Sequence, residues 1–183
     1  MPRLAAAATV IAAVAIAAIS GALSIASGER AAAPTPQPEW REAPWPFPMD
    51  PWGKGSAFRC DASRCGAELT IYLRAKIGFC NCTGGMADDA ELERIGDLEL
   101  LGSGAVALSA GRPVRVQWMP GRSRLFRTSD GLTVLSVGFH DGCDAMVATA
   151  LLGHAAPETA ERRAMEFLDS GIAADWARTT LGL

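Results

Sequence analysis

The sequence predicts an α+β domain, in which a mainly antiparallel sheet carries C-terminal helices, preceded by an N-terminal apolar helix and a proline- and tryptophan-rich linker. Residues 69–74 alternate between apolar and polar side chains, which is the two-residue period of a strand. Asp141-Gly142 separates two apolar runs and is a dipeptide that favours a hairpin turn. Apolar residues recur at helical spacing after Pro157. Strands followed by helices are typical of an antiparallel sheet with helices packed on it.

An uncharged segment, residues 4–27, lies near the N-terminus. About 20 apolar residues suffice to span a bilayer, so we expect residues 1–28 to be a membrane anchor. The residues before Ser27 are also small enough for signal-peptide cleavage, which makes a cleaved secretion signal the alternative. The first case places the protein in the inner membrane with a periplasmic or extracellular domain, and the second makes it a secreted protein.

Residues 29–54 form the predicted linker and contain most of the eleven prolines of the chain. Proline lacks a backbone donor and fixes φ, so neither a helix nor a central strand is expected there. Flexible linkers are poor in aromatic residues, whereas this one carries Trp40, Trp45, Phe47 and Trp52. We interpret its second half as a belt packed on the domain, with a docking strip for a protein partner as the alternative.

The remaining residues, 55–183, have the size of one domain with its own core. The chain has a formal net charge of −3, so its charge balance gives no indication of nucleic-acid binding. Two C-terminal helices are expected in this domain. The first begins at Pro157, and the second follows Gly171 with Ile172 and Trp176 on one side.

A further short helix is expected after Asp88. Asp88 is a good N-cap, Glu91 stands where it completes a capping box, and Gly96 suits the C-terminal stop. Leu92 and Ile95 would form the buried side of this helix.

Pro120-Gly121 predicts the turn of a hairpin, because proline pre-sets the first central position and glycine allows a positive φ at the second. Pairing back from this turn places Arg115, Arg122 and Arg124 on one face. We interpret that face as solvated, so its charges would contribute little to stability. A patch for an anion, a lipid headgroup or an acidic partner is the alternative.

Asp141-Gly142 predicts the turn of a second hairpin and sets its register. With these two residues as the turn, His140 faces Cys143 across the hairpin. Both strands are apolar on both faces, so we expect them to be central strands that are covered on each side.

The chain contains five cysteines. In an exported domain we expect them to form disulfides, because disulfides persist in oxidising compartments. Cys60 and Cys65 flank a four-residue loop between two strands, so we predict that they are bridged. Cys80 and Cys82 are two residues apart at a strand end and would point to the same face. We expect Cys143 to lie close to at least one of them.

Three interpretations of this second group remain open. In a structural one, Cys143 bonds Cys80 or Cys82 and leaves one cysteine over. In a metal-binding one, all three thiolates and His140 hold Cu(I) or Zn(II). In a redox one, a bridge exchanges among the three sulfurs by thiolate attack.

No catalytic motif is evident, since the sequence contains neither G-x-S-x-G nor H-E-x-x-H. We therefore expect a non-catalytic binding or accessory protein with a disulfide-stabilised domain and without a cofactor. The alternative is a periplasmic thiol protein, either a copper or zinc carrier or a disulfide-exchange enzyme. Its site would consist of Cys80, Cys82, His140 and Cys143.

Overall fold

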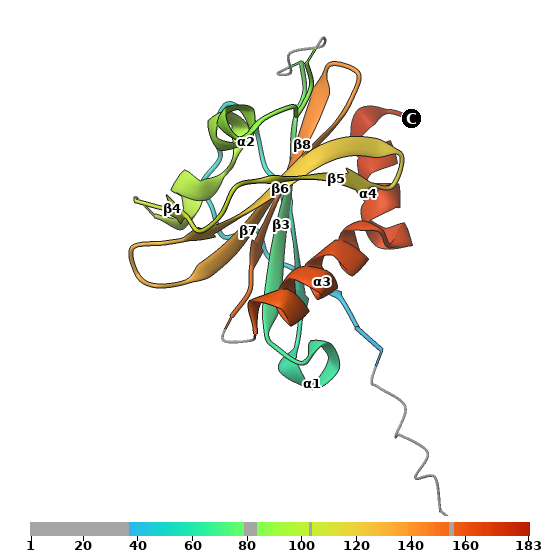
Figure 1. The fold of residues 1–183 in the computed structure, drawn as a ribbon. Coiled ribbons are helices and arrows are strands. Elements are labelled where there is room, and N and C mark those ends of the chain that lie inside the picture. Colours follow the sequence, from blue (N-terminus) through green and yellow to red (C-terminus); the bar gives the residue numbers. More distant parts are fainter. Residues whose placement is uncertain (1–36, 79–83, 103, 154–155) are drawn as a thin grey trace, which may run out of the picture. The chain divides into compact units, whose positions relative to one another are not determined.

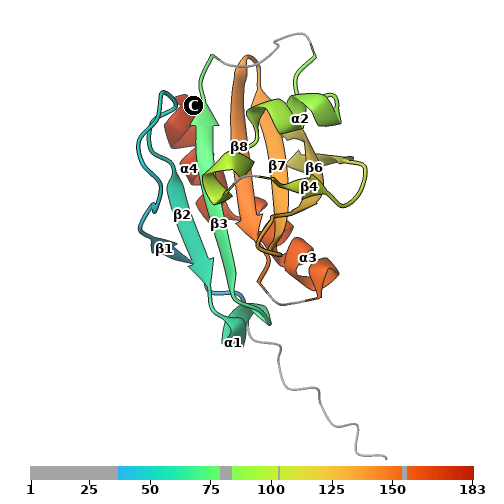
Figure 2. The same ribbon diagram turned by 90° about the vertical axis from the view of Figure 1, so that its left-hand side faces the viewer.

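Eight antiparallel strands form one sheet within the described residues, and helices cover both of its faces (Figures 1 and 2). The computed structural model describes residues 37–183 except 79–83, 103 and 154–155. The predicted α+β class is confirmed, with helices at the C-terminus. The predicted anchor lies outside the described residues. Among the helices that the structure describes, none is both long and apolar enough to cross a membrane.

The strand order is β1-β2-β3-β8-β7-β6-β4, and β5 pairs with β6 alongside β4. The strands are β1 (Arg41–Ala43), β2 (Ser56–Cys60), β3 (Leu69–Lys76), β4 (Val106–Ala107), β5 (Arg112–Val116), β6 (Met119–Arg127), β7 (Thr133–Asp141) and β8 (Asp144–Leu151). The helices are α1 (Ala62–Cys65), α2 (Asp89–Ile95), the 3-10 helix η1 (Leu98–Leu101), α3 (Pro157–Leu168) and α4 (Gly171–Leu181). Figure 2 shows α2 in front of the sheet and α3 and α4 behind it.

The face of the sheet toward α3 and α4 carries the larger apolar core. Leu73, Ala148 and Val137 lie side by side across β3, β8 and β7, and each is at most 1% exposed. Phe167 of α3 packs on Phe58 of β2, with the ring centroids 4.9 Å apart. This layer follows from the apolar side chains at every second position of the strands.

The opposite face, toward α2, is partly polar although it is covered. Arg74, Ser136 and Thr149 are each at most 1% exposed on this side of the sheet. Val147 and Ile95 add a small apolar cluster. Burying a polar group costs free energy unless the group is hydrogen-bonded. Arg74 has such partners, whereas the hydroxyls of Ser136 and Thr149 have none among the described residues. It is the face that holds the candidate site.

The predicted short helix after Asp88 is α2, and its N-cap, its end and its buried side are confirmed, while the Glu91 carboxylate accepts hydrogen bonds from Arg94. Asp88 is the N-cap, and its Oδ1 accepts a hydrogen bond from the Glu91 backbone N–H at 2.8 Å. The helix ends before Gly96, and both Leu92 and Ile95 are fully buried. Capping and the apolar spacing are local signals, which explains why the sequence locates this helix well.

The break at Gly171 also separates α3 from α4 as expected, but the buried side of α4 differs. Ile172 is 46% exposed, and the buried positions of α4 are alanines. Trp176 is half-buried and its Nε1 donates a hydrogen bond to Ser56 Oγ at 3.0 Å. Small side chains let a helix lie close to a sheet, so alanine rather than isoleucine forms this contact.

The turn of the β7–β8 hairpin consists of Gly142 and Cys143, not of Asp141 and Gly142 as predicted. His140 therefore pairs with Ala145 and does not face Cys143. Gly142 has a φ of 56°, which suits a hairpin turn with glycine in its first central position. Because each pair is shifted by two positions, every side chain keeps its predicted face. Both strands are central and buried, as expected.

The turn of the β5–β6 hairpin lies at Gln117 and Trp118, and the predicted turn at Pro120-Gly121 is wrong. Gln117 has a φ of 55°, and its backbone N–H donates to Asp169 Oδ1 at 3.1 Å, at the junction of α3 and α4. Gly121 lies inside β6, where a Cβ would come within 2.4 Å of a backbone oxygen of β7. Contacts with distant segments thus place this turn, in spite of the local preference.

The second half of the predicted linker packs on the domain. Residues Arg41–Ala43 form β1, which pairs with β2. Trp40 lies against Phe167, with ring centroids 4.5 Å apart, and Trp45 meets Tyr72 edge-on at 5.8 Å. The domain that the structure describes therefore extends on the N-terminal side of the predicted boundary.

The predicted disulfide between Cys60 and Cys65 is present, with an Sγ–Sγ distance of 2.07 Å. Cys60 ends β2 and Cys65 ends α1, so the connection contains a helical turn rather than an open loop. Both cysteines are buried against the apolar core.

Replacing Cys60 and Cys65 together with alanine is expected to lower the free energy of unfolding by about 2 kcal/mol, because the bond closes a short loop in the unfolded chain. Chemical denaturation measures this loss. Ser63→Ala, an exposed change in the same loop, is the control and should alter stability by less than about 0.5 kcal/mol. Equal stability of the double variant and the unsubstituted chain would contradict the prediction.

Candidate functional site

Two ion clusters lie on the α2 face of the sheet, and each joins segments that are distant in the sequence. The Arg74 cluster consists of Arg74, Lys76, Asp97 and Asp50. The Asp89 cluster consists of Asp89, Glu93, Arg122 and Arg124.

Arg74 is fully enclosed on β3, next to the start of η1. Its Nε donates to Asp97 Oδ2 at 2.9 Å, and its Nη2 donates to the other oxygen of the same carboxylate. Its Nη1 donates to Asp50, and Lys76 Nζ lies 2.9 Å from Asp97 Oδ1. Asp97 directly precedes η1, so a bidentate ion pair attaches η1 to the sheet.

Burial and pairing act in opposite directions on these charges. Burial by itself lowers the pKa of Arg74, but hydrogen bonds and charge interactions with Asp97 and Asp50 raise that pKa above its ordinary value. Burial raises the pKa of Asp50, but hydrogen bonds from Arg74 and from the Trp52 backbone N–H leave that pKa below its ordinary value. Arg74 and Asp50 are therefore both charged at neutral pH.

Two tryptophans of the segment between β1 and β2 cover the cations of this cluster. The Arg74 Cζ lies 6.0 Å from the centroid of the Trp45 ring, and the Lys76 Nζ lies 5.3 Å from the centroid of the Trp52 ring. Cations are attracted to aromatic faces at such distances. Gly55 makes room for this cover, because a Cβ there would come within 2.5 Å of the Trp45 ring.

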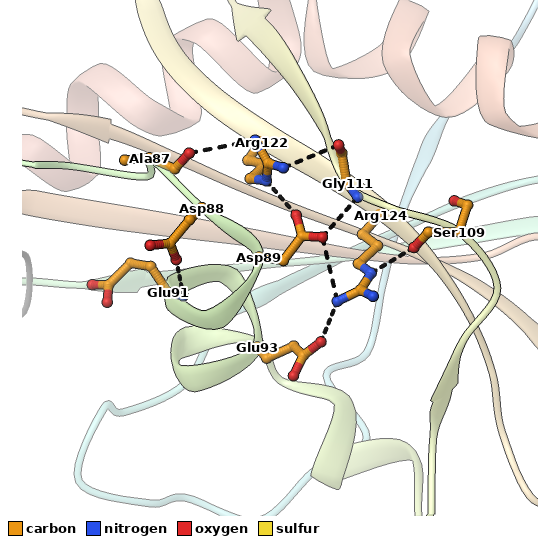
Figure 3. Close-up of polar contacts among 9 residues, drawn as sticks. All are labelled: Ala87, Asp88, Asp89, Glu91, Glu93, Ser109, Gly111, Arg122 and Arg124. Carbon is orange, nitrogen blue, oxygen red and sulfur yellow. Dashed lines mark hydrogen bonds and ion pairs between the residues drawn. The ribbon is translucent and has the colours of Figure 1, made fainter.

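The Asp89 cluster joins the first turn of α2 to β6 and to the segment before β5 (Figure 3). Asp89 Oδ2 accepts a hydrogen bond from the Gly111 backbone N–H at 2.9 Å, and Oδ1 accepts from Arg122 Nε. The Gly111 hydrogen bond and then the Arg122 guanidinium hold the pKa of Asp89 below its usual range. Asp89 is thus a fixed anion that orients both neighbours.

Arg122 and Arg124 are covered rather than solvated, contrary to the predicted exposed face. Their side chains are only 19% and 16% exposed. Arg122 uses all three guanidinium nitrogens, donating to Asp89 and to the backbone oxygens of Ala87 and Gly111. Arg124 Nε donates to a backbone oxygen at 2.7 Å, and its Nη1 donates to the Glu93 carboxylate.

Arg115 shares the sheet face of Arg122 and Arg124 but not their surroundings. It is exposed, it pairs with Pro120 in the sheet, and its Nη1 donates to the Trp118 backbone oxygen at 2.9 Å. The three arginines of the suggested anion patch are therefore divided between a packed ion cluster and an exposed strand.

The predicted thiol site lies only partly within the described residues, because Cys80 and Cys82 fall outside them. Cys143 is exposed at the tip of the β7–β8 hairpin and is disulfide-bonded. His140 packs against Gly85, where a Cβ would lie 2.1 Å from His140 Nε2. The Nδ1 of His140 is buried and has no hydrogen-bond partner in the part of the chain that the structure describes. No group of three or more His, Cys, Asp or Glu side chains within the described residues could hold a metal ion.

The Arg74 cluster has no local signature in the sequence. The alternation of β3 puts Arg74 and Lys76 on the non-core side of the strand, where charged residues are usually solvated. Their carboxylate partners are 23 and 24 positions away for Arg74, so no local spacing indicates the pairing. The sequence contains only an indirect signal. Arg74 lies on a strand beside the β7–β8 hairpin, which is covered on both faces, and a buried cation needs a partner.

The fold and these clusters define a disulfide-containing α+β domain in which paired charges bind the covering segments to one sheet face. No protein-family model matches the chain, and neither the curated proteins nor the solved structures gave a match.

Replacing Arg122 with glutamine is expected to lower the free energy of unfolding by about 2 kcal/mol, because a partly buried guanidinium loses its carboxylate and backbone acceptors. Arg115→Gln is the matched control on the same sheet face and should cost less than about 0.5 kcal/mol. Denaturant unfolding of both variants provides the comparison. If both variants lost the same small amount of unfolding free energy, the three arginines would lie on one solvated face, as the sequence predicted.

Proposed function

We propose that this protein is exported and anchored in the membrane by residues 4–27, and that its α+β domain is a non-catalytic binding or accessory module. The disulfide between Cys60 and Cys65 is the observation that carries the exported location. Thiols are kept reduced in the cytosol, whereas disulfides persist in exported domains. Cys143, which is also disulfide-bonded, supports the same location.

The contacts of the charged residues support a binding or accessory role. Arg74 and Arg122 each use all three guanidinium nitrogens on acceptors of the protein itself. Such groups hold segments in place, and their donors are engaged in the folded domain. As long as the covering segments stay in place, recognition by this domain would use its exposed surface, including residues 40–52 on its N-terminal side.

Deleting residues 4–27 is expected to keep the protein in the cytosol and to abolish membrane association, because this segment supplies the apolar length that crosses the bilayer. Fractionation followed by carbonate extraction measures membrane association, and protease accessibility in intact cells and spheroplasts measures the side on which the domain lies. The full chain should remain in the membrane pellet with an exported domain.

Two other outcomes of this experiment separate the parts of the proposal. A soluble, exported protein beginning near Ser27 would show a cleaved signal in place of an anchor. A full chain whose domain stays protease-protected in the cytosol would contradict export altogether.

The second candidate function is a thiol protein that uses Cys80, Cys82, Cys143 and His140. The surroundings of His140 favour it: the imidazole packs on Gly85, shortly after the two cysteines in the sequence, and its buried Nδ1 has no hydrogen-bond partner among the described residues. Since Cys60 and Cys65 are bonded to each other, the partner of Cys143 within one chain would be Cys80 or Cys82, which leaves one thiol over.

Thiol counting under denaturing conditions without reductant separates the two candidates. The first predicts one free thiol, no co-purifying metal and a single partner for Cys143 in peptide mapping. Three free thiols with copper or zinc by elemental analysis would favour a carrier. A mixture of bonds from Cys143 to Cys80 and to Cys82 would favour disulfide exchange.

A further inference from the structure

Asp50 belongs to a segment without regular secondary structure, although it completes the Arg74 cluster. We call residues 44–53, between β1 and β2, the strap. The strap crosses the α2 face of the sheet with Trp45 over Arg74 and Trp52 over Lys76. Its Asp50 accepts the hydrogen bond from Arg74 Nη1.

We infer that Arg74 and Lys76 form a carboxylate-binding site that the strap closes with its own Asp50, and that an acidic peptide from a partner can occupy this site in place of the strap. The peptide would be a segment with an aspartate or glutamate at the start of a turn and aromatic residues on both sides of it. The inference concerns the isolated domain and does not depend on export or anchoring.

The charge balance of the cluster identifies the ligand as an anion. Arg74 and Lys76 contribute two positive charges, and Asp97 supplies one negative charge that both cations share. Without Asp50 the enclosed site therefore carries an uncompensated positive charge, which is unfavourable in a covered position. The free donor would be Arg74 Nη1, and a carboxylate oxygen is the acceptor that it already binds in the structure.

Asp50 begins a turn that is stabilised by hydrogen bonds within the strap itself. Asp50 Oδ1 accepts from the Trp52 backbone N–H at 2.8 Å, and the Asp50 backbone oxygen accepts from the Gly53 N–H at 2.9 Å. With Pro51 inside it, this turn is ordered by its own residues. An acidic segment of another chain that forms such a turn could bring a carboxylate to the same place.

The strap is held by side-chain contacts, whereas the sheet beneath it is held by strand pairing. Among the described residues, the buried Trp45 Nε1 has no hydrogen-bond partner, which is a cost of docking this ring. Met49 is 75% exposed beside Asp50, and a hollow of about 570 Å³ is lined by residues at both ends of the strap. The strap takes no part in the pairing of β2 with β3, so it can move without breaking the hydrogen bonds between these strands.

Rescue of an Asp50→Ala chain by formate tests the site. The full chain with this substitution is titrated with sodium formate at neutral pH, with sodium chloride at equal ionic strength as reference. We expect a saturable rise in melting temperature of about 3 °C once formate exceeds its Kd about fivefold. The Asp175→Ala chain is the matched control, because Asp175 pairs with Arg178 on the exposed surface of α4.

A rise no larger than that in chloride, or an equal rise in the Asp175→Ala chain, overturns the carboxylate site. If the Asp50→Ala chain does not fold unaided, recovery of folded protein on refolding in formate and in chloride gives the same comparison. Recovery that depends on formate supports the site, and equal recovery overturns it.

A second experiment, with a peptide, tests whether a carboxylate within a polypeptide segment can occupy the site. A labelled peptide of residues 44–53 is added to a chain with Trp45→Ala and Asp50→Ala, and binding is followed by fluorescence anisotropy. We expect the peptide with asparagine in place of Asp50 to bind about tenfold more weakly, because it lacks the charge that Arg74 pairs with. Formate rescue with equal binding of both peptides would restrict the site to free carboxylates and overturn the peptide ligand.

Discussion

The cation of Arg74 on a covered face of the sheet is the constraint on which much of this structure depends. The start of η1 and the ring of Trp45 cover Arg74 on the α2 face of β3, so its charge has no direct access to water. Such a charge must be matched by carboxylates in good geometry. Asp97 meets this need from the start of η1 and Asp50 from the strap, so that one side chain positions two segments that have no strand pairing with β3.

The same principle operates at the other side of this face, where Asp89 joins α2 to β6 and to the segment before β5. Apolar packing, as between α3 and the sheet, is non-directional and tolerates small displacements. Charge-assisted hydrogen bonds require defined positions of donor and acceptor. The α3 and α4 face therefore supplies most of the apolar burial, while the α2 face specifies where its covering segments lie.

Features that depend on neighbouring residues could be predicted from the sequence. The two-residue period of β3, the caps of α2 and the break at Gly171 each involve a few adjacent positions. The bridge between Cys60 and Cys65 spans only five positions and was equally accessible. The order of strands and helices was sufficient for the α+β class, because antiparallel strands joined by short connections pair with one another.

The candidate site was less accessible, since its partners are far apart in the chain. The sequence alone determined the α+β class, the helix α2 with its N-cap, the alternation of β3 and the first disulfide. Only the tertiary structure decided that Arg122 is enclosed while Arg115 is exposed, and that a turn lies at Gln117 rather than at Pro120-Gly121. The physical reason is that local propensities differ by only about 1 kcal/mol, whereas a collision with a neighbouring strand or an unpaired buried charge costs more.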